Sequence, residues 1–120
     1  MVDLNNDGVD EALMSLNYTD IDSLGLKVFY NTLAALSFDT KEVIPFFDGL
    51  PGHNIASTPW IGDINNDHFL DIITCSSNNK RKTYSFDGLS IQYLKTTIEI
   101  TSPIKWGAYM GSNYDGVFRK

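Results

Sequence analysis

Two short acidic segments share one pattern and begin 60 positions apart. Residues 3–11 read DLNNDGVDE and residues 63–71 read DINNDHFLD, so each segment places acidic or amide oxygens at every second position of its first half. A loop that only reverses the chain can be built from Gly and Ser without this much charge. The repeated pattern therefore constrains the fold to one that presents two equivalent polar loops.

Size and net charge limit the functions that the chain can have. The 120 residues are 42% apolar and 12% aromatic, which is enough for the core of one ordinary domain. The net charge is −6, and the two acidic segments hold seven carboxylates, so the rest of the chain is close to neutral. The short basic run Lys80, Arg81 and Lys82 is typical of a solvated turn, and no nucleic-acid partner is predicted.

The sequence has no apolar stretch long enough for a membrane span, and its first residues lack the basic end and apolar middle of a signal peptide. Export, if it occurs, is expected to be encoded elsewhere. Cys75 is the single cysteine and cannot form an internal disulfide. Its place in the apolar run FLDIITC predicts a small buried side chain. These residues alone leave the compartment open.

Short apolar runs bounded by Gly, Pro, Asn and Asp predict an all-β fold. The stretch NTLAALSF is the one candidate for a helical turn, and it is too short and uncapped to predict a helix. The expected strands are EALMSLNY, LKVFY, EVIPFF, FLDIITC, RKTYSF, LSIQYL and TTIEI, with turns at DTKE, DGLPG, NNK and DG.

Internal similarity extends beyond the acidic segments. The strand–turn–strand LSFDTKEVI at 36–44 resembles YSFDGLSI at 84–91, and GSNYDGVF at 111–118 is a degraded third copy of the loop. On this alignment the first copy carries an insertion of about a dozen residues around TDIDSLGLKVFYN. Such repeats favour stacked or radial architectures, and four-stranded antiparallel β-propeller blades fit best. The prediction is a partial β-propeller over residues 1–120, with repeat 1 at about 1–50, repeat 2 at about 51–100 and a degenerate third repeat or closing element at about 101–120.

The alternating oxygens suit a hard divalent cation. Calcium takes about six to eight oxygen ligands from carboxylates, amides and backbone carbonyls. Side chains at loop positions 1, 3, 5 and 9 and the carbonyl at position 7 can face one centre, and a bound cation explains how so many like charges coexist there. The expected ligands are Asp3, Asn5, Asp7, the carbonyl of Val9 and Glu11 in the first loop, and Asp63, Asn65, Asp67, the carbonyl of Phe69 and Asp71 in the second.

Two alternatives compete with a calcium loop of this kind. A plain turn is the first, since Asn, Asp and Gly are common turn formers, but two copies with acidic residues at positions 1, 5 and 9 favour metal binding. An EF-hand is excluded because Met14 and Thr74 stand where its position-12 Glu is required. His68 replaces Gly8 in the second loop, and His visits left-handed conformations more readily than most residues. The affinity of the second loop is the more doubtful of the two.

The segments DLNNDGVDEAL and TPWIGDINNDHFLDII resemble the calcium-binding hairpin loops of FG-GAP (VCBS-type) repeats, which form the propeller blades of integrin α-subunits and of many secreted bacterial proteins. The resemblance covers the chain through residue 75 and is weak thereafter, and no metal site is carried to GSNYDGVF. It implies that each loop joins the innermost strand of a blade to the second. The resemblance further implies that NIASTPWIG, FLDIITCSS, RKTYSFD and LSIQYLKTTIEI are successive strands of one blade, and that the chain is a fragment with about two blades.

The resemblance implies a Ca²⁺-binding propeller segment of a secreted or cell-surface protein that acts in protein or carbohydrate recognition or adhesion, with the remaining blades in a longer chain. The competing class is an accessory or catalytic propeller of an extracellular polysaccharide-degrading enzyme, and a third is a scaffold whose loops bind nothing. No nucleophile elbow, phosphate loop or zinc spacing occurs, and His53 is expected to be an ordinary surface residue. Core packing is expected of Trp60, Trp106, Tyr109 and Tyr114, with a ligand-binding surface as the alternative.

Overall fold

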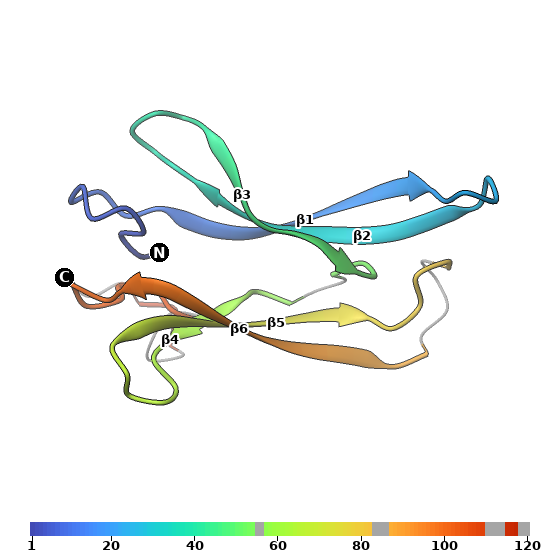
Figure 1. Cartoon of the computed structure of the whole chain (residues 1–120). Helices are drawn as coiled ribbons and strands as arrows, with labels where there is room; N and C mark the ends of the chain where they lie inside the picture. Colours follow the sequence, from blue (N-terminus) through green and yellow to red (C-terminus); the bar gives the residue numbers. More distant parts are fainter. Residues whose placement is uncertain (55–56, 83–86, 110–114, 118–120) are drawn as a thin grey trace.

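The computed structural model describes residues 1–54, 57–82, 87–109 and 115–117 and shows an all-β protein (Figure 1). Two three-stranded antiparallel sheets keep their strands in chain order. The expectation of an all-β fold is confirmed, and no membrane-spanning helix occurs in the described ranges. The first sheet consists of β1 (Ala12–Ile21), β2 (Lys27–Leu36) and β3 (Val43–Pro51), and the second of β4 (Trp60–Gly62), β5 (Phe69–Ser77) and β6 (Leu89–Glu99).

β2 is the central strand of the first sheet. It pairs with β1 from Ala12↔Leu36 to Ile21↔Lys27 and with β3 on its other edge. The segment NTLAALSF, the one stretch with a helical alternative, lies mostly in β2. Two flanking ladders satisfy its backbone, and burial of Leu33 and neighbouring side chains overrides the helix propensity of Ala and Leu.

The expected turn DGLPG at 48–52 is wrong for most of its length, because β3 continues through residue 51. The hydroxyls of Thr32 and Tyr18 both donate to Oδ1 of Asp48, which fixes this residue against the sheet. Register shifts in the β2–β3 ladder accommodate Gly49 with its φ of 70°. Tertiary hydrogen bonds therefore keep a turn-like sequence extended.

The second sheet corrects the expected blade order. β5 and β6 form where strands were expected, but they pair directly with each other, from Ser77↔Leu89 to Phe69↔Glu99. A strand at 81–87 cannot lie between them, since the β5–β6 ladder already uses both facing edges. Part of that expected strand, residues 83–86, lies outside the described part of the chain. Four-stranded blades are thus not formed by the strands described.

The two sheets repeat one hairpin. Ala12 pairs with Leu36, 24 residues later, and Ile72 pairs with Leu94, 22 residues later. The hairpin β1–β2 is therefore equivalent to β5–β6, and the expected insertion of about a dozen residues is wrong: those residues form the ends of β1 and β2 and their turn. The third copy expected at 111–118 falls mostly outside the described residues.

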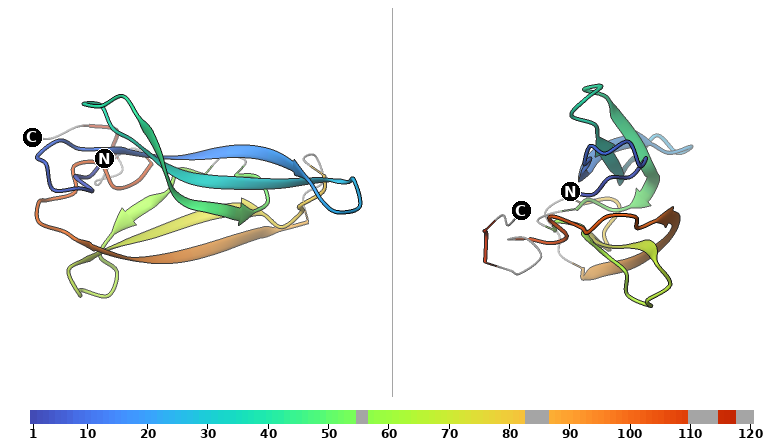
Figure 2. Two further views of the ribbon diagram at one scale, coloured as in Figure 1. Left: turned by 45° about the horizontal axis from the view of Figure 1, so that its top comes forward. Right: turned by 90° about the vertical axis from the view of Figure 1, so that its left-hand side faces the viewer.

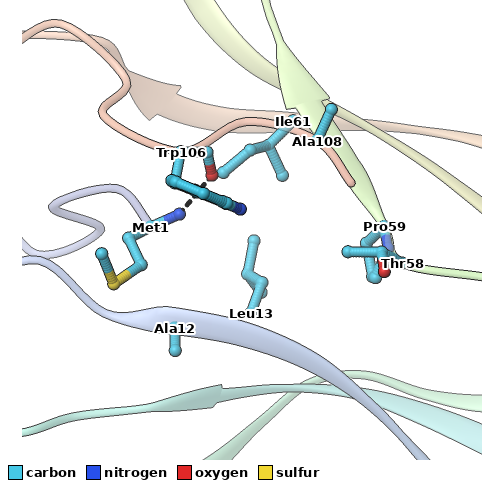
Figure 3. A pocket seen from close by; sticks show the side chains of 8 residues that line it. All are labelled: Met1, Ala12, Leu13, Thr58, Pro59, Ile61, Trp106 and Ala108. Atoms are coloured by element: carbon cyan, nitrogen blue, oxygen red, sulfur yellow. Dashed lines mark hydrogen bonds between the residues drawn. The ribbon is translucent and has the colours of Figure 1, made fainter. Parts of the chain in front are cut away.

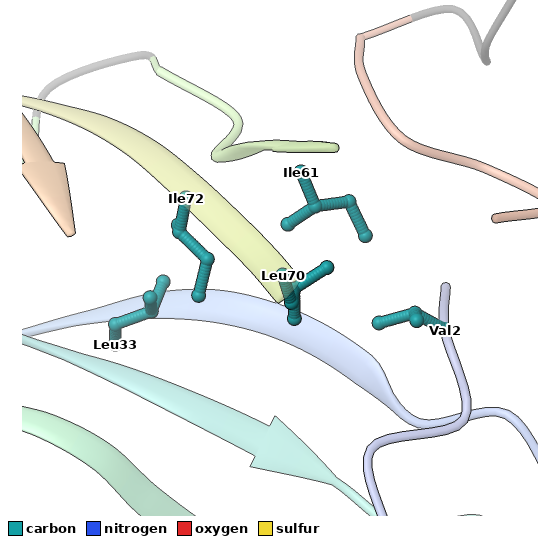
Figure 4. Packing of buried hydrophobic residues seen from close by; sticks show 5 residues of the cluster. All are labelled: Val2, Leu33, Ile61, Leu70 and Ile72. Atoms are coloured by element: carbon teal, nitrogen blue, oxygen red, sulfur yellow. The ribbon is translucent and has the colours of Figure 1, made fainter. Parts of the chain in front are cut away.

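The hydrophobic core lies between the two sheets, which Figure 2 shows as two layers. Val2 and Leu33 come from the first half of the chain and meet Ile61, Leu70 and Ile72 from the second (Figure 4). All five are at most 4% exposed. Full burial of one such side chain stabilises a fold by about 1.5–3 kcal/mol. Because each sheet buries its inner face against the other, we expect both halves to unfold together.

The sheets also approach each other closely at Gly52, directly after β3. Gly52 has a φ of 80°, and a Cβ built there would lie 1.9 Å from the carbonyl oxygen of Ser77. The backbone N–H of Ser77 donates to the carbonyl of His53 at 2.8 Å, and the Ser76 hydroxyl donates to the carbonyl of Pro51 at 2.8 Å. Only Gly fits this junction between β3 and β5.

Substitution Gly52→Ala is expected to destabilise the protein by about 3 kcal/mol or more, because the left-handed conformation costs about 1–2 kcal/mol and the Cβ displaces the Ser77 backbone. Gly25→Ala is the matched control, since Gly25 has a similar φ of 75° and a Cβ added there would meet no atom within 4 Å. The Gly25→Ala control should lose only the free energy of unfolding that comes from the left-handed conformation, about 1–2 kcal/mol. Equal losses of the two variants in equilibrium urea unfolding would contradict the importance of the close approach.

Candidate metal centre

The two acidic loops occupy equivalent places at one end of the molecule (Figure 1). The first is closed by a bridge between Val2 and Glu11, at the start of β1. The second is closed by pairing of Gly62 with Asp71, where β4 meets β5. Each loop therefore leads from a short paired segment, Val2 in one case and β4 in the other, into a long strand, and position 9 of the loop lies near the start of that long strand.

The position-1 carboxylate organises each loop by accepting backbone hydrogen bonds. In the first loop Asp3 Oδ1 accepts from the N–H of Asp7 at 3.2 Å and Oδ2 from the N–H of Gly8 at 2.9 Å. The second loop repeats both bonds at 3.1 Å and 2.9 Å, through Asp63, Asp67 and His68. These bonds fold the loop around the acidic side chain.

Positions 3, 5 and 9 continue the same network. Asn5 Oδ1 accepts from the N–H of Asp7 at 3.0 Å, and Asp7 Oδ1 accepts from the N–H of Val9 at 2.8 Å. Glu11 Oε2 reaches back to the N–H of Leu4 at 2.8 Å. The second loop repeats all three bonds at 3.1, 3.0 and 2.9 Å through Asn65, Asp67, Phe69, Asp71 and Ile64. The structure thus brings the expected ligand residues of each loop together.

Left-handed backbone conformations recur at the same loop positions. Asn6 and Asn66 have φ values of 59° and 57°, and Gly8 and His68 have φ values of 90° and 68°. The expectation that His68 can take the turn position of Gly8 is confirmed. Its N–H makes the same hydrogen bond as that of Gly8, so the substitution does not change the shape of the loop.

The two loops differ in the hydrogen bonding of the second oxygen of the position-9 carboxylate. Asp71 is fully buried, and its Oδ1 accepts a hydrogen bond from the Tyr93 hydroxyl at 2.7 Å. This bond raises the pKa of Tyr93. Glu11 is 3% exposed, and its Oε1 is buried without a hydrogen-bond partner among the described residues. A buried carboxylate oxygen without a donor is costly, so Glu11 is the acidic group that gains most from a cation.

The two loops also differ in the ion pairs that their carboxylates form with lysine side chains. Lys95 on β6 donates to Asp67 Oδ2 at 2.5 Å, which lowers the pKa of Asp67 and raises the pKa of Lys95. Beside the first loop, Lys105 pairs at 2.8 Å with Asp10, which is not an expected ligand. Within the described residues, no Lys or Arg forms an ion pair with the ligand carboxylates of the first loop, Asp3, Asp7 and Glu11.

The donor set fits calcium in kind: each loop offers three carboxylates, one amide oxygen and one backbone carbonyl. Among the described residues, however, no group of three or more Asp, Glu, His or Cys side chains already converges as a metal site. The position-1 carboxylate and its neighbours point at backbone N–H groups instead. Ion binding would therefore require the side chains to rotate while the loop backbone keeps its shape.

A separate pocket of about 310 Å³ lies between the sheets near the N-terminus (Figure 3). The N-terminal ammonium of Met1 donates to the carbonyl of Trp106 at 2.5 Å, and burial lowers its pKa. The described lining offers no carboxylate, imidazole or thiol for catalysis. It consists of Met1, Ala12, Leu13, Thr58, Pro59, Ile61, Trp106 and Ala108.

The sequence also singles out one histidine and four aromatic residues, whose described environments differ. His53 Nε2 lies 3.2 Å from the carbonyl of Tyr18, and its ring centroid is 4.4 Å from that of Phe29. Trp60 and Trp106 are half-buried, whereas Tyr109 is 72% exposed, so the expected core packing is wrong for Tyr109. Tyr114 lies outside the described residues.

Comparisons with protein-family models, curated proteins and solved structures find no match to the chain. The resemblance to FG-GAP-type repeats therefore remains an expectation that depends on the two acidic loops. Sequence reasoning did not identify Tyr93 and Lys95, because both act from β6, and no local pattern indicates which residue of a distant strand lies opposite a loop.

The turn positions provide a test of the loop geometry. Gly8→Ala is expected to destabilise the protein by about 1–2 kcal/mol, because it forces a side chain into a left-handed conformation. His68→Ala is the matched control at the equivalent position, where a Cβ is already present, and should change stability by less than about 0.5 kcal/mol. Thermal and urea unfolding in chelator measure the stability of both variants. Similar losses of stability for Gly8→Ala and His68→Ala would contradict the equivalence of the two turns.

Proposed function

We propose that the chain is a calcium-binding propeller segment of a secreted or cell-surface protein, where it acts in protein or carbohydrate recognition or adhesion. The observation that carries the calcium proposal is the duplicated hydrogen-bond network, in which the first loop leaves Glu11 Oε1 buried without a donor among the described residues. Turns that served only to reverse the chain would not require a buried, half-satisfied carboxylate. The extracellular and recognition parts of the proposal rest on the family resemblance.

Calcium would neutralise the acidic side chains of a loop and hold both of its ends. In the first loop the ligand residues run from Asp3, next to the Val2 bridge, to Glu11 at the start of β1. Val2 belongs to the core between the sheets, so an ion held by these residues stabilises the packing of that core as well as the loop. In the second loop Asp63 and Asp71 link β4 to β5 in the same way.

Exposed apolar side chains on the outer strands support the proposal that further blades belong to a longer protein. Val43 and Ile44 on β3 are each 50% exposed, and Leu89 and Ile91 on β6 are 53% and 75% exposed. β3 and β6 are also edge strands of their sheets, and uncovered edges with apolar side chains favour association with other strands. Neighbouring blades would cover such surfaces.

Millimolar calcium is expected to raise the midpoint of thermal unfolding, relative to chelator, by several degrees, because an ion bound only by the folded state stabilises it by mass action. Asp3→Asn and Asp63→Asn each keep the size of the side chain and remove one ligand charge. Each variant is expected to lose one calcium from the stoichiometry measured by isothermal titration calorimetry.

Asp20→Asn is the charge-matched control for this experiment. Asp20 lies on the exposed far end of β1 and makes a hydrogen bond to the N–H of Ile21, so its removal should leave calcium binding unchanged. Magnesium is the control ion, since it demands a tighter octahedral site and should stabilise less than calcium. A folded protein that shows neither heat nor a thermal shift with calcium would refute the proposed function.

A further inference from the structure

The two loops have the same backbone but different partners on the neighbouring strand. Beside the second loop, β6 presents two donors: Tyr93 bonds to Asp71 at 2.7 Å and Lys95 bonds to Asp67 at 2.5 Å. Both acceptors are expected calcium ligands, at loop positions 9 and 5. The second loop therefore already receives one positive charge from its own sheet.

Strand register identifies the equivalent positions beside the first loop. Ile73 pairs with Tyr93 and Asp71 with Lys95 in the second hairpin. In the first hairpin Leu13 pairs with Ala35, so Ala35 stands where the second hairpin has Tyr93. Ser37 follows Leu36 and stands where the second hairpin has Lys95. Neither a methyl group nor a short hydroxyl can supply the missing charge.

The unpaired oxygen of Glu11 is a direct consequence of this difference. With Ala35 in place of Tyr93, nothing on β2 donates to Glu11 Oε1, and the described residues leave this buried atom without a hydrogen bond. The first loop thus combines uncompensated charge with an unsatisfied buried acceptor. In the second loop, Lys95 of β6 supplies a positive charge and Tyr93 of β6 donates a hydrogen bond to the buried carboxylate.

We infer that the two loops are unequal calcium sites: the first loop is the tight site, and Lys95 is a built-in competitor that weakens calcium binding at the second. This inference rests on the proposed function, because it concerns the same two loops. Calcium must displace the Lys95 ammonium from Asp67, or share the carboxylate with it, before it can bind the second loop. No such displacement is needed at Asp3, Asp7 and Glu11.

Displacement of Lys95 is feasible because its pair with Asp67 is exposed. The side chains of Lys95 and Asp67 are 54% and 30% exposed, and ion pairs in such surroundings are worth little. Together with the repulsion between an ammonium group and a divalent ion a few ångströms away, the competitor should weaken binding by about tenfold. The second loop is thus a site for higher calcium concentrations.

Calcium titration calorimetry on the whole chain tests the inference at fixed ionic strength. Asp3→Asn should abolish the tighter of two sites, whereas Asp63→Asn should leave it. In the Asp3→Asn background, which isolates the second loop, Lys95→Met should raise the calcium affinity of the remaining site by about tenfold. Thermal unfolding in chelator verifies that every variant is folded, and the exposure of Lys95 makes its replacement tolerable.

Two controls separate competition from general charge effects. Lys95→Arg keeps the positive charge and should leave the affinity of the second loop low. Lys27→Met removes one charge at the far end of β2, where screening by salt should keep the change in affinity below about twofold.

The possible results separate this inference from the proposed function. If Asp63→Asn rather than Asp3→Asn abolishes the tighter site, or if Lys95→Met leaves the second site unchanged, the inference is wrong while calcium binding stands. If no variant of the folded protein binds calcium, the proposed function fails, and the inference fails with it.

Discussion

Mutual repulsion among the carboxylates of each acidic loop is the constraint on which the loops and their attached strands depend. Both loops reduce this repulsion in the same way: backbone N–H groups donate hydrogen bonds to the carboxylate at position 1, Asp3 or Asp63. Tying the loop in this manner places Val2 opposite Glu11 and Gly62 opposite Asp71, which starts β1 and β5 in register. The same register carries Leu70 and Ile72 into the core between the sheets, so local charge compensation and global packing depend on each other.

β6 and the residues after it connect the two loops to each other. Thr96 lies at a register shift in the β5–β6 ladder, and its hydroxyl donates to the carbonyl of Leu70 at 2.7 Å. Beyond the strand, the N–H of Ile100 donates to the carbonyl of His68 at 2.9 Å, and the Thr101 hydroxyl donates to Oδ1 of Asn6 at 2.5 Å. The adjacent residues Ile100 and Thr101 therefore each contact a different acidic loop, so this short segment fixes the two loops beside each other.

The parts of the structure that could be predicted from the sequence are those in which partners are close along the chain. The hydrogen bonds that backbone N–H groups of the first loop donate to the side chains at positions 1, 3, 5 and 9 join residues at most seven positions apart, as in the contact of Leu4 with Glu11, so the spacing of Asp and Asn indicates this part of the loop geometry. Strand pairing is not local in this sense. The residues of DGLPG are typical of a turn, and only the distant Thr32 and Tyr18, which bind Asp48, explain why this segment is extended. The direct pairing of β5 with β6 differs from the prediction because the blade order implied by the family resemblance places RKTYSFD between these two strands.

The same distinction explains where the two loops differ. From the residues of the loops alone, His68 in place of Gly8 would be the reason to expect weaker calcium binding at the second loop, yet the N–H groups of both residues bond the position-1 carboxylate at the same 2.9 Å. The difference lies outside the loops, in the residues of β2 and β6 that face them: Ala35 and Ser37 beside one, Tyr93 and Lys95 beside the other. Duplicated loops can therefore keep closely similar backbones while residues of the neighbouring strand set the charge beside each loop, and the strand register identifies those residues.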